Sequence, residues 1–430
     1  MTLFLRDVTF YDWRTERLLR GDLLVDNGSH GSLRPTAEPP PAGATVIDGG
    51  GRLAMEGLTC GHHHLYSALA RGMPAPPRAP RNFAEVLAGV WWRLDRCLDL
   101  EMVRASALAA AVDCLRCGVT RVIDHHASPN ASTGSLPAIA AALEEVGLSH
   151  VLCYELSDRD GPDAAAAGLD ETAAYLASGR PGLVGLHASF TVGDELLAAA
   201  VALAAKHRVG LHLHVAEDVV DQERCLADHG RRVVERLAER GVLEQRGSLL
   251  VHCLHLSPDE RELVRRSGAW VVHNPESNQN NGVGALHWDG LDPARVLIGT
   301  DGLHGDMLRS MRAAFLSGQA QGGLAPALAW QALWTNQRYL ERHHPAAARR
   351  NDVVLFDYLP PTPLQEDNVP AHALFGLDAR HVRTVIAGGR VVLEDGRLTC
   401  LDEAAVMQFC QEQARRLWEA LERPAPKGRP

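Results

Sequence analysis

The chain lacks any continuous apolar run of about 18 residues, the length that a membrane-spanning helix requires. Its first residues, MTLFLRDVTFYDWRTERLL, carry charges within the apolar stretch, so the uninterrupted hydrophobic region of a secretory signal is also missing. We therefore expect a cytoplasmic protein that makes no use of a membrane.

Cysteine is scarce, with nine residues scattered over 430 positions. An odd number at this spacing does not provide a disulfide framework, and free thiols suit a reducing compartment. Cys114 and Cys117 form a CxxC within a helical pattern, but no second cysteine pair accompanies them. We interpret this pair as helix packing rather than as a zinc or redox site.

No run of lysine and arginine dominates the chain, and the formal net charge is -10. Nucleic-acid binding requires a concentrated basic face, so this balance disfavours it. Hydrophobic residues make up 46% and charged residues 22%, which is ordinary for a soluble globular protein. A neutral or cationic small molecule is the kind of partner that this composition favours.

Short strand-like runs broken by Gly, Pro and Asn fill residues 1–55, and a similar pattern returns in residues 353–400. We expect these two pieces to form one discontinuous β-sandwich domain. Residues 56–352 would form a larger domain, and residues 401–430 a C-terminal helix and tail.

Eight strand-like runs alternate with helical patterns in the larger domain. They begin at residues 57, 120, 149, 182, 210, 249, 269 and 295. Strands alternating with helices imply a parallel sheet, and eight such units predict an α/β fold with a closed (β/α)8, TIM-like barrel. The gap after NPESN shows no obvious helix, so we expect a functional loop there.

Polar residues collect at the C-terminal ends of seven of these runs, where a barrel builds its active site. His62 and His64, in CGHHHLY, leave the same face of an extended strand and can bind one ion together. A histidine of the fifth run and Asp301 of the eighth complete an N3O set. This set suits one divalent zinc ion, with iron or manganese as alternatives. Spacing alone leaves His212 and His214 as equal candidates.

The chemistry of such a centre follows from charge, because a bound divalent ion makes hydroxide available at neutral pH. Asp301 can accept the proton of that water, and His252 can hydrogen-bond the water or the tetrahedral oxygen. Glu217 can carry a proton to a ring nitrogen and then to a leaving amine, although a solvated carboxylate at a helix start is an alternative interpretation.

With these residues identified, the sequence resembles the amidohydrolase superfamily, in the branch of single-metal aminohydrolases and chlorohydrolases. The motifs GLTCGHHHLYSALARG, HLHVAED, VHCLHL, HNPESNQNN and GTDGLHGDM occur in order and carry this resemblance. It implies that His62, His64, His214 and Asp301 bind the metal. It also assigns Glu217 and His252 to catalysis and makes a homo-oligomer an expectation.

A closer resemblance is to the SsnA-type aminohydrolases. It rests on VWWRLDRCLD from residue 90, VIDHHASP from 122, NPESNQNN from 274, TDGLHGDM from 300 and DYLPPTPLQEDN from 357. It implies a metal-dependent hydrolase that deaminates a nitrogen heterocycle, purine-like or related. Ring opening of a cyclic amide or amidine, removal of a halide, and a non-catalytic metal-binding barrel are the alternatives.

Four further residues are candidates for binding the substrate. Trp92 can stack on a flat heterocycle, although its neighbour Trp91 fits the same description. His187, at the end of the fourth run, can hydrogen-bond a ring carbonyl. His126 and Asp306 lie at other strand ends, and we include both.

Overall fold

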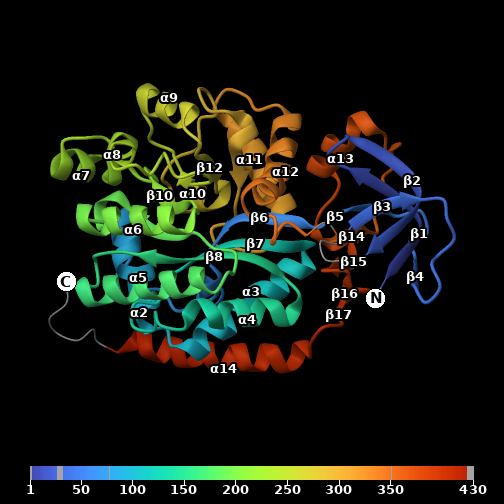
Figure 1. Ribbon diagram of the computed structural model, residues 1–430, viewed down its shortest axis with the longest axis horizontal. Coiled ribbons are helices and arrows are strands. Elements are labelled where there is room, and N and C mark those ends of the chain that lie inside the picture. Colours follow the sequence, from blue (N-terminus) through green and yellow to red (C-terminus); the bar gives the residue numbers. More distant parts are fainter. Residues whose placement is uncertain (1, 27–31, 77, 350, 424–430) are drawn as a thin grey trace.

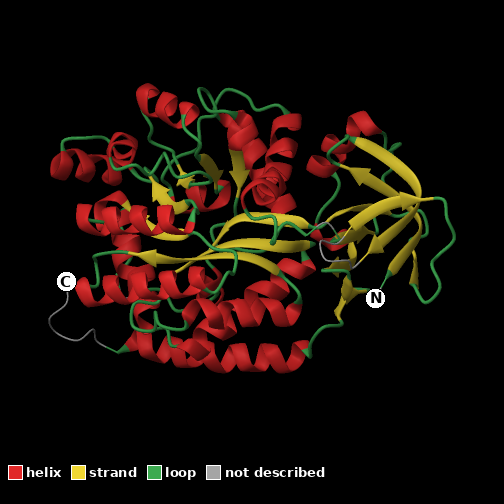
Figure 2. Ribbon diagram, in the orientation of Figure 1, coloured by secondary structure: helices red, strands yellow, loops and turns green. Residues whose placement is uncertain are grey.

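The computed structural model describes residues 2–26, 32–76, 78–349 and 351–423 (Figure 1). A barrel covered by helices forms the larger part, and a smaller sheet lies beside it (Figure 2). Within the described ranges, no helix is both long and apolar enough to cross a membrane.

Eight consecutive parallel strands form the barrel wall, in the order of the sequence. Every residue of these strands is buried, as expected for a parallel sheet covered on both faces. The strands are β6 (Leu58–His63), β7 (Val119–His126), β8 (Ser149–Leu156), β9 (Val184–Ala188), β10 (Leu211–Val215), β11 (Leu249–His252), β12 (Trp270–His273) and β13 (Val296–Ile298).

Helices join these strands and begin where polar side chains can cap them. The Asp99 carboxylate accepts the N–H of Met102 at the start of α3, and Ser257 caps α9 in the same way. The main helices are α3 (Leu100–Arg116), α4 (Ser135–Val146), α5 (Pro162–Ala177), α6 (Asp194–His207), α7 (Val219–His229), α8 (Val233–Glu239), α9 (Pro258–Arg266), α11 (Met307–Ala320) and α12 (Pro326–His343).

Shorter elements occupy the connections. The helices among them are α1 (Phe83–Val86), α2 (Trp92–Cys97), α10 (Pro275–Asn281) and α13 (Val369–Phe375), with single turns η1 (Leu65–Ala70), η2 (Leu87–Trp91), η3 (Ser189–Thr191), η4 (Pro293–Arg295), η5 (Glu366–Asn368) and η6 (Ala379–His381). The helix α10 includes most of NPESN and ends at Asn281, and the expected loop follows it, since residues 282–292 form neither a helix nor a strand.

The seam between the first and last barrel strands is closed by the side chain of Asn336, on α12. Its amide nitrogen donates to the carbonyls of Thr59 (2.6 Å) and Ile298 (2.8 Å), and its oxygen accepts the N–H of Ile298 (3.0 Å). Gly61 faces this seam, where a Cβ atom would lie 2.7 Å from the Ile298 carbonyl oxygen. The two strands that carry His62 and Asp301 are thereby held together.

The smaller sheet combines strands from both ends of the chain, because β14 pairs antiparallel with β5. Its nine strands are β1 (Leu3–Asp12), β2 (Arg17–Asp26), β3 (Ser32–Thr36), β4 (Thr45–Asp48), β5 (Leu53–Glu56), β14 (Val353–Phe356), β15 (Val382–Ala387), β16 (Arg390–Glu394) and β17 (Arg397–Leu398). The prediction of an α/β barrel accompanied by a smaller β-structure from both termini is confirmed.

The last helix, α14 (Glu403–Glu422), returns to the barrel and packs along α3 at the lower edge of the molecule in Figure 1. The Cys410 thiol donates to the Ala105 carbonyl at 3.2 Å, and Arg416 forms an ion pair with Asp99 at 2.6 Å. The tail predicted after this helix lies outside the described residues from 424 onward.

Candidate active site

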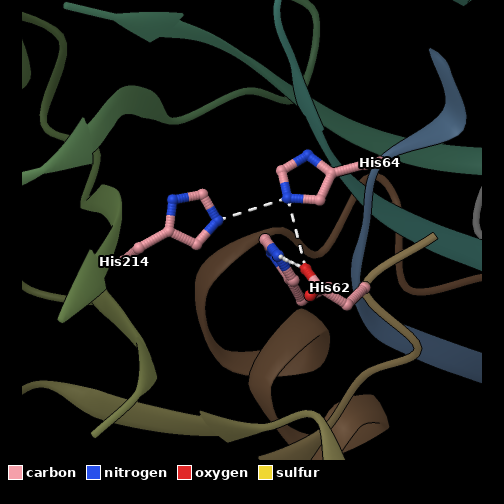
Figure 3. A group of neighbouring side chains, drawn as sticks. His62, His64 and His214 are labelled. Carbon is pink, nitrogen blue, oxygen red and sulfur yellow. Dashed lines mark hydrogen bonds and ion pairs between the residues drawn. The ribbon is translucent and has the colours of Figure 1, made fainter. Parts of the chain in front are cut away.

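Three histidines and one aspartate meet at the C-terminal end of the barrel. His62 and His64 come from the end of β6, His214 from β10, and Asp301 follows β13 (Figure 3). Asp301 Oδ1 lies 2.9 Å from His62 Nε2 and 3.2 Å from His64 Nε2. The Nε2 atoms of His64 and His214 are 3.2 Å apart. Residues separated by more than 230 positions thus present four potential ligand atoms to one point.

The hydrogen bonds behind these rings fit a divalent metal ion. His64 Nδ1 donates to the His125 carbonyl at 2.6 Å, so the Nε2 atom of the neutral ring carries a lone pair. Neighbouring lone pairs repel unless a cation lies between them. Ligand bonds of about 2.0–2.1 Å in a tetrahedral zinc site separate the ligand atoms by roughly 3.3 Å, close to the spacing found here. The donor set therefore fits zinc.

The structure separates the functions of the two fifth-strand histidines. His214 faces His64, whereas His212 lies behind His62 and its Nε2 is 2.8 Å from His62 Nδ1. His212 is fully buried, and its other ring nitrogen lies 3.4 Å from Cys153 Sγ. This contact positions the His62 ring, as outer partners of metal-binding histidines commonly do.

The backbone is strained at three strand ends beside this cluster. Ala216, His252 and Asp301 have φ angles of 46°, 72° and 55°, in the left-handed region that non-glycine residues rarely adopt. Such conformations tend to occur at functional sites, where the surrounding structure imposes them.

Glu217 and His252 lie beside Asp301 and form a group whose polar atoms are within 4.8 Å of one another. Glu217 Oε2 is 3.4 Å from His252 Nε2. His252 Nδ1 lies 2.7 Å from Asn278 Oδ1, to which it donates, so its Nε2 faces Glu217 as an acceptor. Burial, and then the negative charge of Asp301, raises the pKa of Glu217 well above its ordinary value.

Asp301 remains ionised in the same surroundings. Burial alone would raise the pKa of Asp301, but the adjacent His62 and His64 lower it well below its ordinary value. The Ser277 hydroxyl, on α10, donates to the second carboxylate oxygen. The pKa values of two neighbouring carboxyl groups are thus shifted in opposite directions, an arrangement that suits acid–base catalysis.

A cavity opens directly over this cluster. Its lining contains His64, His214, Glu217 and Asp301, together with the rings of Tyr66, Phe83, Trp91, Trp92, His187 and Phe190. Both tryptophans line it, so the ambiguity between them remains. His187 Nδ1 is 2.6 Å from the Thr191 hydroxyl, and burial lowers the pKa of His187 to about 4.

Two of the four substrate-binding candidates from the sequence do not line this cavity. His126 is fully buried, bonds to the Ser128 hydroxyl at 2.8 Å and packs against Tyr66 and Tyr154. Asp306 caps α11 by accepting the N–H of Arg309. Both positions have local structural partners.

Sequence reasoning missed Glu155, at the end of β8, and Asp95, on α2, which both line the cavity. Glu155 lies at the end of β8, the one barrel strand for which the sequence analysis predicted no functional residue. A carboxylate at the C-terminal end of a barrel strand could have identified it as a candidate. Burial alone would raise the pKa of Glu155, but the nearby His187, His125 and Arg159 lower it well below its ordinary value.

Residues 53–334 match the model of the amidohydrolase family. A 5-methylthioadenosine/S-adenosylhomocysteine deaminase from Desulforudis audaxviator is 29% identical over 428 residues, covering 93% of this chain and 96% of that protein. A 5'-deoxyadenosine deaminase from Methanothermobacter thermautotrophicus is 28% identical over 418 residues, covering 93% and 95%.

Solved structures share the fold over nearly the whole length. An adenosine deaminase from Xanthomonas campestris with bound zinc superposes with a TM-score of 0.83 at 21% identity, covering 96% of this chain and 98% of that one. The triazine hydrolase of Arthrobacter aurescens gives a TM-score of 0.78 at 20% identity, covering 96% and 99%. At these identities the comparison supports the architecture alone.

Proposed function

The chain belongs to the amidohydrolase family, and we propose that it is a metal-dependent deaminase of a purine-like heterocycle. The observation that carries the proposal is the convergence of His62, His64, His214 and Asp301 beside a buried Glu217. The deaminases among its relatives support the reaction type, because their names identify them as deaminases of adenine-containing compounds.

His62, His64, His214 and Asp301 would hold one divalent ion, and we propose zinc, with iron as the alternative. When bound, such an ion supplies hydroxide at neutral pH by lowering the pKa of a coordinated water to about 7. The structural neighbours that carry zinc are consistent with this choice.

Different residues at and beside the ligand set would carry out the different proton transfers of the reaction. Asp301 is ionised and can accept the proton of the attacking water, while His252 Nε2 can accept a hydrogen bond from the same water. Burial and the charge of Asp301 raise the pKa of Glu217, which favours its protonated form, so it can donate first to a ring nitrogen and, after regaining a proton, to the leaving amine. Ammonia leaves and a carbonyl replaces the amine.

We also propose that Trp92 and His187 contact the substrate, since both line the cavity. We further propose that the protein functions as an SsnA-type aminohydrolase. Support for that class comes from the stretches WWRLDR (91–96) and VIDHHASP (122–129). Their residues include Trp91, Trp92 and Asp95 of the cavity wall.

Ammonia release from 5'-deoxyadenosine, methylthioadenosine, adenine and guanine by the zinc-loaded enzyme tests the reaction. Mass spectrometry of the product adds a second criterion, because deamination raises the mass by about one unit and ring opening by about eighteen, both through attack of the same hydroxide. Glu217→Gln should lower kcat by at least about a hundredfold while the metal stays bound.

Glu223→Gln is the matched control, because Glu223 is an exposed acid on α7, and this substitution should leave kcat unchanged. Binding of these compounds without release of ammonia would contradict the proposed reaction, and a gain of about eighteen mass units would replace it with hydrolytic ring opening.

A further inference from the structure

Glu155 is a buried carboxylate on the cavity wall that the proposed mechanism does not use. It ends β8, its side chain is 4% exposed, and it lines the cavity beside His187 and His214. A carboxylate oxygen of Glu155 lies within 4.8 Å of ring nitrogens of His187 and His214. A carboxylate oxygen of Glu155 also lies within 4.8 Å of ring nitrogens of His64 and His125. It therefore faces the reacting part of a bound substrate.

The other carboxyl groups in the cavity wall already have structural or catalytic partners. Asp95 accepts a hydrogen bond from Arg159, Asp218 caps α7 through the N–H of Val220, and Asp221 accepts the N–H of Ala216 at 2.8 Å. Glu217 and Asp301 belong to the proposed catalytic group. This leaves Glu155 as the carboxylate without such an assignment.

The protein contacts of Glu155 are long. Its Oε2 lies 3.3 Å from His125 Nδ1, and its Oε1 lies 3.5 Å from Arg159 Nη2. Hydrogen bonds to oxygen usually measure about 2.7–3.2 Å, so both contacts are weaker than ordinary hydrogen bonds. His125 Nδ1 has no hydrogen-bond partner, and Arg159 Nη2 donates to Asp95. A carboxylate has about four lone-pair sites, and those facing the cavity remain available.

Donors from a ligand would complete the hydrogen bonding of this carboxylate, whose contacts with His125 and Arg159 are long. A buried acceptor that is left without a donor costs about 1–3 kcal/mol, and more when it is charged. The described residues that line the cavity include no lysine or arginine, so the wall is also unsuited to an anionic substituent. Both facts favour a ligand that brings N–H groups.

We infer that Glu155 determines substrate specificity by accepting hydrogen bonds from N–H groups of the base that loses its amine. This inference rests on the proposed function and adds the substrate class: a purine-like base with a ring N–H or a second amine in addition to the amine that it loses. Because Glu155 lies close to His64 and His214, it favours donors on the base over donors on a sugar, which in a nucleoside lies across the bicyclic ring from the reacting carbon.

Equilibrium binding tests the inference without turnover when it is measured in zinc-loaded Glu217→Gln protein. Adenine is compared with 2,6-diaminopurine, which adds an amine at C2, and with 8-oxoadenine, which adds an N–H at N7. At least one addition should tighten binding by about tenfold or more, as expected for a hydrogen bond to a charged acceptor. Adding Glu155→Gln should reduce that gain to less than about threefold, with zinc content unchanged.

Glu144→Gln is the control, because Glu144 is an exposed acid on α4 that pairs with Arg180. Comparison of adenosine with 2',3'-dideoxyadenosine distinguishes ring donors from sugar donors. The inference is overturned if Glu155→Gln leaves the affinity gain from both added ring groups unchanged. It is also overturned if Glu155→Gln reduces only the contribution of the sugar hydroxyls to binding, or if this variant loses the zinc. Failure of the deaminase proposal is recorded separately, as absence of ammonia release by the unmodified enzyme.

Discussion

At the scale of single residues, two histidines on one strand face of β10 have different surroundings. His214 Nε2 faces the ligand cluster, whereas His212 supports His62 from behind. Alternation along a strand places both on the same side, so the difference comes from depth in the barrel rather than from direction. A fully buried histidine that contacts a metal ligand, as His212 contacts His62, affects metal binding by fixing the orientation of that ligand.

Replacement of His212 should therefore weaken metal binding without abolishing it. His212→Ala removes the partner of His62 Nδ1, and loss of such an outer contact typically reduces metal affinity by about 10–100-fold. Competition with a chromophoric zinc chelator measures the change. Affinity equal to that of the unmodified protein would show that His212 does not position His62.

Asp221 gives the stability of the protein a defined pH dependence. Burial raises the pKa of Asp221 to about 7, above the value of about 3.9 for an unfolded chain. The folded state thus binds this proton more tightly, and the carboxyl group lowers the free energy of unfolding as the pH rises from about 4 through 7. The effect at pH 8 is on the order of a few kcal/mol.

Asp221→Asn removes this titration while keeping the size of the side chain. The melting temperature of the variant, relative to that of the unmodified protein, should rise between pH 5 and pH 8. Calorimetry at the two pH values measures the difference. A difference that stays constant with pH would mean that Asp221 does not titrate in this range.

Much of the site is predictable from residue patterns, and the limits are physical. The spacing of His62 and His64, and the location of Asp301 at a strand end, predict their proximity because parallel strands all point one way around a barrel. Asp95 could not be found in this way, since it comes from the short helix α2 and approaches the cavity only through the packing of that segment.

At the scale of elements, α12 joins the two ends of the barrel sheet. Asn336 makes three hydrogen bonds to the backbones of β6 and β13, whose ends carry the first and last residues of the ligand set. A helix inserted at the seam thus controls the geometry of a site that it does not touch.

Asn336→Ala should lower the free energy of unfolding by about 3 kcal/mol, because buried backbone groups lose their partners. The melting temperature of the zinc-loaded protein measures this effect, and zinc affinity should fall as well. Gln408→Ala, which replaces an exposed residue on α14, is the control. A normal melting temperature in Asn336→Ala would show that the seam closes without this side chain.

The helix α10 illustrates why some elements escape sequence analysis. Its residues, PESNQNN, are polar and show no apolar periodicity, so the sequence predicted no helix over them, and the loop expected after NPESN begins only beyond Asn281. Pro275 at its start and Gly282 at its end are ordinary helix signals, but the helix buries Ser277 and Asn278 against the site instead of burying apolar residues against a core. Its polar face binds catalytic side chains.

At the scale of the whole molecule, the two chain ends combine in one sheet beside the barrel. Pairing of β5 with β14 joins residues about three hundred positions apart. The chain continues from β5 directly into β6, at whose end the first two ligands lie. The alternation of strands and helices predicted this architecture because each barrel unit repeats one pattern. The packing of α14 on α3 depends on specific tertiary contacts that no periodicity encodes.

Metal content is the most direct test of the central claim that one divalent ion is held by His62, His64, His214 and Asp301. Elemental analysis should find about one equivalent of zinc in the unmodified protein and in His287→Ala, an exposed control, and almost none in His62→Ala or Asp301→Ala. Retention of about one equivalent in both ligand variants would contradict the account.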